Sequence, residues 1–246
     1  KCRQIQEDIV LTYEDDFGKY KKRANPDLLR VTMRGVCHQI GEKLTFKQIS
    51  ADYRSSQIRE ALRLLTLAGI VSPVVATSGN GIPLDAEADE SRQKVLFLDP
   101  GLLLAVLNLE GTLSQQLIES IMTDSPQELV NKGCIAEMVA GLEIMRNKPA
   151  VQRQKLYYWK KTGNSVAEVD YLEILNATVT PIEVKSGTQG GMKSLWLFMC
   201  EKHLKEAIRC SLENFGEIDY VDKEEQPSVV RHVKIYPLYA MKQLGR

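Results

Sequence analysis

The chain has 246 residues, of which 43% are hydrophobic and 26% are charged, and its formal net charge is zero. This is ordinary globular composition, long enough for one large domain or two smaller ones. No apolar run reaches the ~18 residues of a membrane span, and no two of the five cysteines are spaced as a CxxC pair. We therefore expect no membrane segment, no disulfide framework, no zinc site and a reducing, cytoplasmic location.

Residues 1–23 are expected to form a helical lead-in, because Ile5, Ile9 and Tyr13 recur at helical spacing. The chain opens inside this helix and has no initiator methionine. We therefore expect it to be a fragment of a longer protein.

Residues 24–110 have the pattern of a winged helix-turn-helix, with three short helices followed by a strand and a loop. The third helix is expected to begin at an N-cap, Ser55 or Ser56, and to end before Gly69 at the position of a C′ glycine. If this helix binds DNA, its outer face presents Gln57, Arg59, Arg63 and Thr66. The alternative is a role in protein contact or as a spacer. The acidic wing expected at 77–94 favours that alternative, because acid repels phosphate.

Residues 111–131 are expected to be a helical linker, and 132–246 to form an α+β or α/β domain. A helix, KGCIAEMVAGLEIMRN, precedes three strand-like runs in 155–187. An apolar helix, MKSLWLFMCEKH, and a last strand, VRHVKIYPLY, follow. The predicted element order is therefore α-β-β-β-α-β.

The second and third of these runs are predicted to form a hairpin with a two-residue turn at Asn176–Ala177. This register sets Asp170 opposite Glu183 and Glu168 opposite Lys185, all on one face, since side chains alternate along a strand. Opposed carboxylates repel one another unless a cation lies between them. Oxygen ligands suit Mg²⁺ or Mn²⁺. The hairpin therefore predicts a metal site of the kind that cleaves phosphodiesters.

The motif D-x12-E-x-K formed by Asp170, Glu183 and Lys185 resembles the PD-(D/E)xK nuclease superfamily. That resemblance implies a restriction-endonuclease-like α-β-β-β-α-β core, with these three residues catalytic. It also implies metal ligation by Asp170, Glu183 and a glutamate from the preceding helix, a place that Glu137 occupies. The chain departs from the motif at Val169, where the family name places a proline.

Several stretches resemble the domain of unknown function 4143, among them YEDDFGKY, SSQIREALRLLTLAGIV, KVLFLDPGLL, AEVDYL and PIEVKSG. The resemblance covers nearly the whole chain. It implies a C-terminal fragment of a prokaryotic AAA-type ATPase, whose N-terminal ATPase module would be a partner. The chain has no G-x-x-x-x-G-K-[ST] motif, so we expect no ATP site within it.

Three further groups of residues could approach nucleic acid. Gln189 and Lys193 follow the strand that carries Glu183, and a loop and a helix start are the alternative. A run of aromatic residues flanked by lysines could stack on bases, although core positions in a strand are favoured. The members of this run are Lys155, Tyr157, Tyr158, Trp159, Lys160 and Lys161.

Three functions remain open from the sequence. The first is a metal-dependent nuclease that cleaves DNA. The second is a catalytically inactive module that binds nucleic acid or protein and is coupled to the missing ATPase half. The third is a structural role in oligomer or partner contact, and the oligomeric state itself is not predicted.

Overall fold

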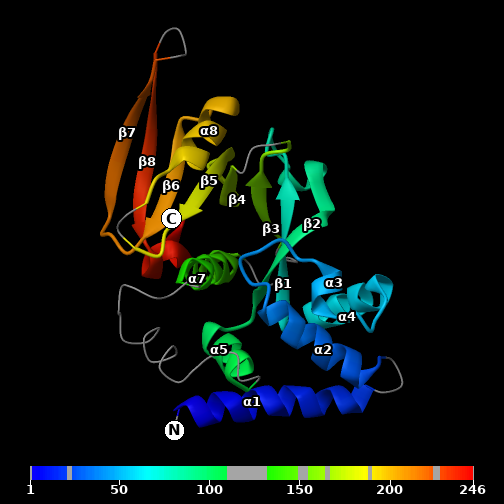
Figure 1. Ribbon diagram of the computed structural model, residues 1–246. Coiled ribbons are helices and arrows are strands. Elements are labelled where there is room, and N and C mark those ends of the chain that lie inside the picture. Colours follow the sequence, from blue (N-terminus) through cyan, green and yellow to red (C-terminus); the bar gives the residue numbers. More distant parts are fainter. Residues whose placement is uncertain are drawn as a thin grey trace. The chain divides into compact units, whose positions relative to one another are not determined.

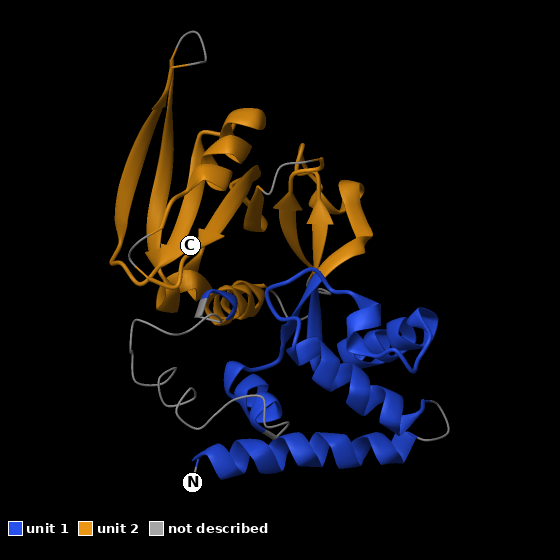
Figure 2. Cartoon of the chain, in the orientation of Figure 1, with its two compact units in different colours: residues 1–73, 94–134 blue, residues 74–93, 135–246 orange. Residues whose placement is uncertain are grey.

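A computed structural model describes residues 2–20, 24–109, 132–148, 155–163, 167–187, 190–223 and 228–245 (Figure 1). The chain divides into two compact units (Figure 2): residues 1–73 with 94–134, and residues 74–93 with 135–246. The linker expected at 111–131 lies outside the described residues. Within the part described, no helix is long and apolar enough to cross a membrane.

The first unit is built from helices. In chain order these are α1 Cys2–Asp16, η1 Phe17–Tyr20, α2 Pro26–Cys37, α3 Phe46–Ile49, α4 Ser55–Leu67 and α5 Pro100–Leu109. The start of α2 follows from local chemistry: Asn25 caps it by accepting a hydrogen bond from the Asp27 amide at 2.9 Å, and Pro26 stands at the first helical position. Arg34 of α2 forms a bidentate ion pair with Glu14 of α1, which ties these two helices together.

The expected N-cap of α4, Ser55 or Ser56, is wrong. Its N-cap position is Arg54, whose amide donates to the Gln57 side chain at 3.0 Å, so the side chain three residues into the helix does the capping. The C-terminal end is confirmed: Ala68 is the C-cap and Gly69 follows at φ +73°, the left-handed conformation that glycine adopts without strain.

The second unit is a mixed sheet with helices. Its first two strands are β1 Val71–Thr77 and β2 Ala88–Phe97. The elements that follow are α7 Lys132–Asn147, β3 Leu156–Lys160, β4 Glu168–Leu175, β5 Thr178–Val184, α8 Lys193–Glu201, β6 Glu206–Ser211, β7 Gly216–Asp222, β8 Val229–Pro237 and η3 Leu238–Gln243. The strand order is β2-β1-β3-β4-β5-β6-β8-β7. The order of elements from α7 to α8, one helix, three strands and a second helix, agrees with the predicted order. The strands β6 and β7 were not predicted, and β6, rather than the strand at the C-terminal end, is the neighbour of β5.

The hairpin expected to be a wing belongs to this sheet. Strands β1 Val71–Thr77 and β2 Ala88–Phe97 flank the short helix η2 Leu84–Glu87, and residues 74–93 belong to the second unit. Strand β1 pairs with β3 in parallel, with Val74 opposite Leu156 and Ala76 opposite Tyr158. The helices α2, α3 and α4 follow the predicted order. The hairpin after them is not a free wing, because β1 pairs with β3 of the second unit.

The core of the second unit lies between the sheet and α8. It contains Val169 and Leu172 of β4, Val179 of β5, and Leu195, Phe198 and Met199 of α8, with Trp159 of β3. The Trp159 and Phe198 rings lie 4.9 Å apart and are tilted by 57°, a favourable aromatic arrangement. Burial of Trp159 excludes it, together with the fully buried Tyr158, from stacking on bases.

The β4–β5 turn contains Asn176 and Ala177, both with positive φ, at +49° and +58°. Changing Ala177 to glycine is expected to raise the free energy of unfolding by about 0.5–1 kcal/mol, because glycine adopts this conformation without the steric penalty that alanine incurs. Urea unfolding measures the change. Ala88→Gly, in extended backbone at φ −72°, is the control and should destabilise the fold. Equal effects at both positions would contradict the expectation.

Candidate functional site

The hairpin register of β4 and β5 is confirmed. The paired residues run from Leu175 opposite Thr178 to Tyr171 opposite Ile182, as predicted. Asp170 and Glu183 are the next residues beyond the last of these pairs, and the charge of Asp170 acts on Glu183. The Asp170 Oδ2 atom accepts a hydrogen bond from the Val184 amide at 2.7 Å. This bond fixes the Asp170 carboxylate beside the end of β5.

A β-bulge lies on the other side of β4. Tyr157 pairs with Leu172 and Trp159 with Val169, so two steps along β3 match three along β4. Regular alternation along β4 would place Val169 on the same face as Tyr171, two positions away, but the bulge separates them. Val169 belongs to the core beside α8, whereas the Tyr171 hydroxyl donates to the Glu137 carbonyl of α7 at 2.7 Å. The bulge therefore places the two neighbours of Asp170, Val169 and Tyr171, on opposite sides of the sheet.

Glu183 is a buried carboxylate, with 8% of its side chain exposed. Its Oε1 atom accepts from Lys185 Nζ at 2.5 Å, and its Oε2 atom is buried with no hydrogen-bond partner in the described part of the chain. Burial raises the pKa of Glu183 to about 7, and the charges of Asp170 and Glu168 act in the same direction. The Lys185 ammonium opposes this rise.

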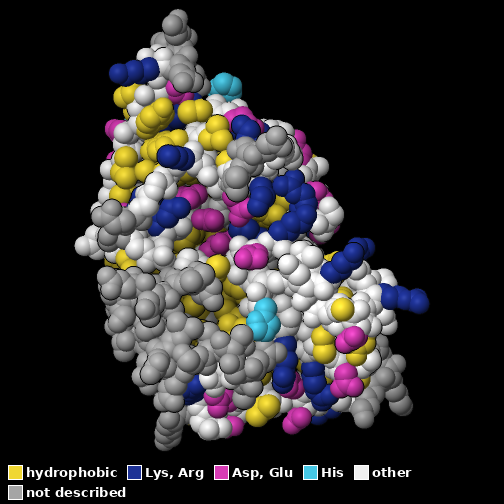
Figure 3. All heavy atoms as spheres, in the orientation of Figure 1, with side chains coloured by type: hydrophobic (Ala, Val, Ile, Leu, Met, Phe, Trp, Pro, Cys, Tyr) yellow, Lys and Arg dark blue, Asp and Glu magenta, His cyan; other side chains and the backbone are white. Residues whose placement is uncertain are grey.

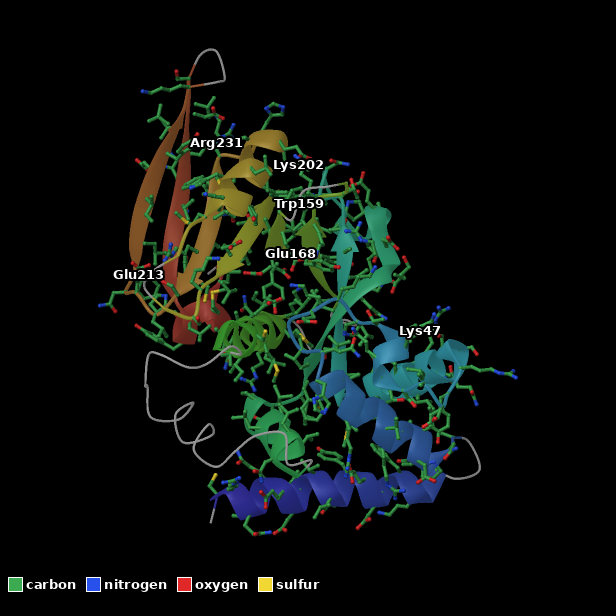
Figure 4. All side chains as sticks on the ribbon, viewed as in Figure 1. Lys47, Trp159, Glu168, Lys202, Glu213 and Arg231 are labelled. Carbon is green, nitrogen blue, oxygen red and sulfur yellow. The ribbon has the colours of Figure 1, made fainter. Side chains whose placement is uncertain are left out.

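A third carboxylate, Glu168 at the start of β4, is labelled in Figure 4. It pairs with Lys160 on β3, and the Glu168 Oε2 atom accepts from Lys160 Nζ at 2.9 Å. Because its charge also acts on Glu183, the three carboxylates of 168, 170 and 183 form one electrostatic cluster with Lys185.

Glu137 approaches the cluster from α7. Burial raises the pKa of Tyr171 well above its usual value, and the charges of Glu137 and Asp170 add to the rise. Both carboxylates therefore lie near this phenol. Among the described residues, however, no three or more His, Cys, Asp or Glu side chains are placed as a group that could hold a metal ion. Metal ligation by Glu137, Asp170 and Glu183 stays a prediction.

Arg209 is a site residue that the sequence did not reveal. It lies on β6 directly beside Glu183 and is buried, with 4% of its surface exposed. It donates to the Gly190 carbonyl at 3.0 Å and pairs with Glu213 at 3.2 Å. Figure 4 labels Glu213. A Cβ on Gly190 would lie 3.1 Å from Lys185 Cδ, so this glycine contacts the lysine stem. Arg209 thus secures the backbone against which Lys185 lies.

The predicted nucleic-acid-binding residues of α4 have partners within the first unit. Gln57 caps its own helix, Arg59 lies 5.6 Å from the centre of the Phe46 ring, and Arg63 forks onto Glu60. Lys193 is exposed at the start of α8, and Gln189 lies outside the described residues. Their role in binding nucleic acid stays a prediction.

Comparison with known proteins finds two matching family models. Residues 1–113 match the domain of unknown function DUF8612, and residues 132–231 match the domain of unknown function DUF4143. No curated protein and no solved structure matches the chain. The DUF4143 resemblance predicted for nearly the whole chain is therefore found in the C-terminal part, which contains all residues of the carboxylate cluster.

Proposed function

We propose that the second unit is a divalent-metal-dependent nuclease whose reacting centre is Asp170, Glu183 and Lys185. The observation that carries the proposal is the buried Oε2 atom of Glu183, which has no hydrogen-bond partner in the described part of the chain. A buried carboxylate oxygen without a partner costs free energy. A cation between Glu183 and Asp170 would remove that cost and their mutual repulsion.

The donor set suits a hard cation. Asp170 and Glu183 supply carboxylate oxygens, and Glu137 is proposed as a ligand from α7 that acts directly or through water. Mg²⁺ retains several waters and takes few protein ligands, so two carboxylates are sufficient. When bound, such an ion would polarise the phosphate and lower the pKa of a water.

The protein side chains have separate roles in this proposal. Asp170 is held in place by the Val184 amide. Glu183 must give up its proton near neutral pH to act as a ligand. Lys185, held by Glu183 on one side and by the Gly190 backbone on the other, would orient the attacking water or the phosphate. Following the family resemblance, we propose that an ATPase module is the partner of this unit.

The second candidate is a binding module without catalysis. The observation that favours it is the absence of a three-ligand metal group among the described residues. Such a module would bind DNA with an affinity that falls as salt concentration rises, and it would not cleave the DNA.

The test is cleavage of labelled single-stranded, duplex and branched DNA with Mg²⁺ or Mn²⁺. Asp170→Asn is expected to lower the cleavage rate by about 100-fold or more, because it removes a metal ligand at the reacting centre. Asp219→Asn is the control: Asp219 is an exposed carboxylate on β7, paired with His232. Calorimetry with Mn²⁺ gives a second reading. Wild-type chain that neither binds metal nor cleaves any of the three substrates would exclude the nuclease and favour the binding module.

A further inference from the structure

A cavity of about 340 Å³ lies in the second unit among the β1–β2 hairpin, the end of β3 and the end of α8. Its lining includes four cationic side chains and three carboxylates, so the basic charges are in excess. The cations are Arg92, Lys160, Lys161 and Lys202, and the carboxylates are Glu87, Asp89 and Glu201. Hydrogen-bonding side chains complete the wall, namely Thr77, Ser78, Asn80 and Thr162.

Two of the cations converge on one carboxylate. Lys161 Nζ and Lys202 Nζ each lie 3.2 Å from an oxygen of Glu201. These charges lower the pKa of Glu201 against the effect of burial. Lys202 also donates to the Asn80 side chain at 2.7 Å. An anionic oxygen group is therefore already bound between these two lysines, supplied by the chain itself.

The cavity adjoins the carboxylate cluster through Lys160. This lysine lines the cavity and pairs with Glu168 at 2.9 Å, and the charge of Glu168 acts on Glu183. Arg92 lies beside it and donates to the Lys160 carbonyl at 3.4 Å. Figure 3 shows basic side chains gathered next to acidic ones on this face of the sheet, and Figure 4 labels Trp159, Glu168 and Lys202 there.

We propose that this cavity binds a backbone phosphate of the nucleic-acid strand whose scissile bond lies at the carboxylate cluster. This inference rests on the proposed nuclease function. Phosphate oxygens make the same charge-assisted hydrogen bonds as the Glu201 carboxylate, so a phosphate would take the place of Glu201 between Lys161 and Lys202. Arg92 offers a planar fork for phosphate oxygens.

The cavity reads the backbone and not the bases. Trp159, the aromatic side chain in its wall, is buried against Phe198 and has no free face for a base. Lysines, arginine and hydroxyls that contact phosphate position a strand without reading its sequence. We therefore expect binding to be independent of sequence and strongly dependent on salt.

The test is binding of a fluorescein-labelled oligodeoxynucleotide, followed by fluorescence anisotropy in EDTA, where metal-dependent cleavage does not occur. The double variant Arg92→Gln/Lys161→Gln is expected to bind about 10-fold more weakly, with a salt dependence shallower by about one logarithmic slope unit per cation removed. The matched control is Lys205→Gln/Lys234→Gln, which removes the same charge from two lysines outside the cavity lining, one just before β6 and one on β8. It is expected to bind within about two-fold of wild type.

Cleavage is measured separately, so that the two proposals fail in different ways. Asp170→Asn should lose cleavage and retain oligonucleotide binding. An equal loss of affinity in both double variants, or no loss in either, would overturn the cavity as a phosphate site, whatever the cleavage assay shows. Loss confined to Arg92→Gln/Lys161→Gln would support it even in a chain that cleaves nothing.

Discussion

Replacing Glu183 with glutamine is expected to raise the free energy of unfolding at pH 8 by about 2 kcal/mol, although it removes the proposed metal ligand. Burial and the Asp170 charge raise the Glu183 pKa from 4.5 to about 7. At about 1.4 kcal/mol per pKa unit, ionising Glu183 in the folded state costs at most about 3.5 kcal/mol. Glutamine avoids this cost, but Lys185 loses its ion pair, which reduces the gain.

The pH dependence follows from the direction of this shift. Below about pH 4.5 Glu183 is protonated in the folded and unfolded states, so it adds no dependence. Between 4.5 and about 7 the folded state keeps a proton that the unfolded state has released, so wild-type stability falls as pH rises. Above about 7 the carboxylate is ionised in both states, and the full penalty persists.

Urea unfolding in EDTA at pH 4, 5.5, 7 and 8 measures this dependence. The difference between Glu183→Gln and wild type should grow from pH 4 to pH 8. Glu206→Gln, at an exposed carboxylate, is the control and should change stability by less than about 0.5 kcal/mol throughout. Parallel wild-type and Glu183→Gln curves would contradict the account of Glu183. Added Mg²⁺ should stabilise wild type at pH 8 and not the glutamine variant.

Asp222→Ala is expected to lower the free energy of unfolding by about 3–5 kcal/mol. Arg231 is fully buried, and its guanidinium donates to Asp222 Oδ2 at 2.9 and 3.3 Å and to the Leu204 carbonyl. Figure 4 labels Arg231 on β8. Removing the carboxylate leaves a buried cation without its counter-charge, which is more costly than the loss of one hydrogen bond.

Asp219→Ala provides a matched control for this change. It lies on the same strand as Asp222 and pairs with His232 of β8, but 58% of its side chain is exposed. Exposed ion pairs contribute about 0–1 kcal/mol, so the two aspartates should differ severalfold. Guanidinium unfolding of both variants measures the difference. Similar losses for both would show that the surroundings of Arg231 admit enough water to screen its charge.

Local patterns in the sequence were sufficient for the hairpin that carries the site. The turn residues at Asn176–Ala177 and the alternation on either side fix its register, so the pairing of Tyr171 with Ile182, one step from Asp170 and Glu183, could be predicted. The burial of Glu183 could not, because it depends on packing against β6 and the segment before α8. The β-bulge between β3 and β4, which changes the face on which Val169 lies, also depends on pairing between strands and could not be predicted from the local sequence.

Contacts between distant segments account for the other differences. Strand β6 has an arginine at its centre, so it lacks the continuous apolar run expected of a central parallel strand, and Arg209 was not recognised. The β1–β2 hairpin has the sequence of a wing, and its attachment to the sheet depends on a parallel pairing with β3 about eighty positions later. Parallel pairing needs a crossover and carries no short-range turn signal.

The pairing of β1 with β3 also determines how the chain can be divided. A fragment cut at residue 132, where the DUF4143 match begins, would contain β3 paired with β4 but without β1 on its other side. Leu156 and Tyr158, both fully buried in the whole chain, would then lie on an open sheet edge with unpaired amides and carbonyls. Such an edge recruits strands from other molecules. A fragment cut at this boundary is therefore expected to aggregate through the exposed edge of β3. In the whole chain the β1–β2 hairpin, residues 74–93, protects that edge.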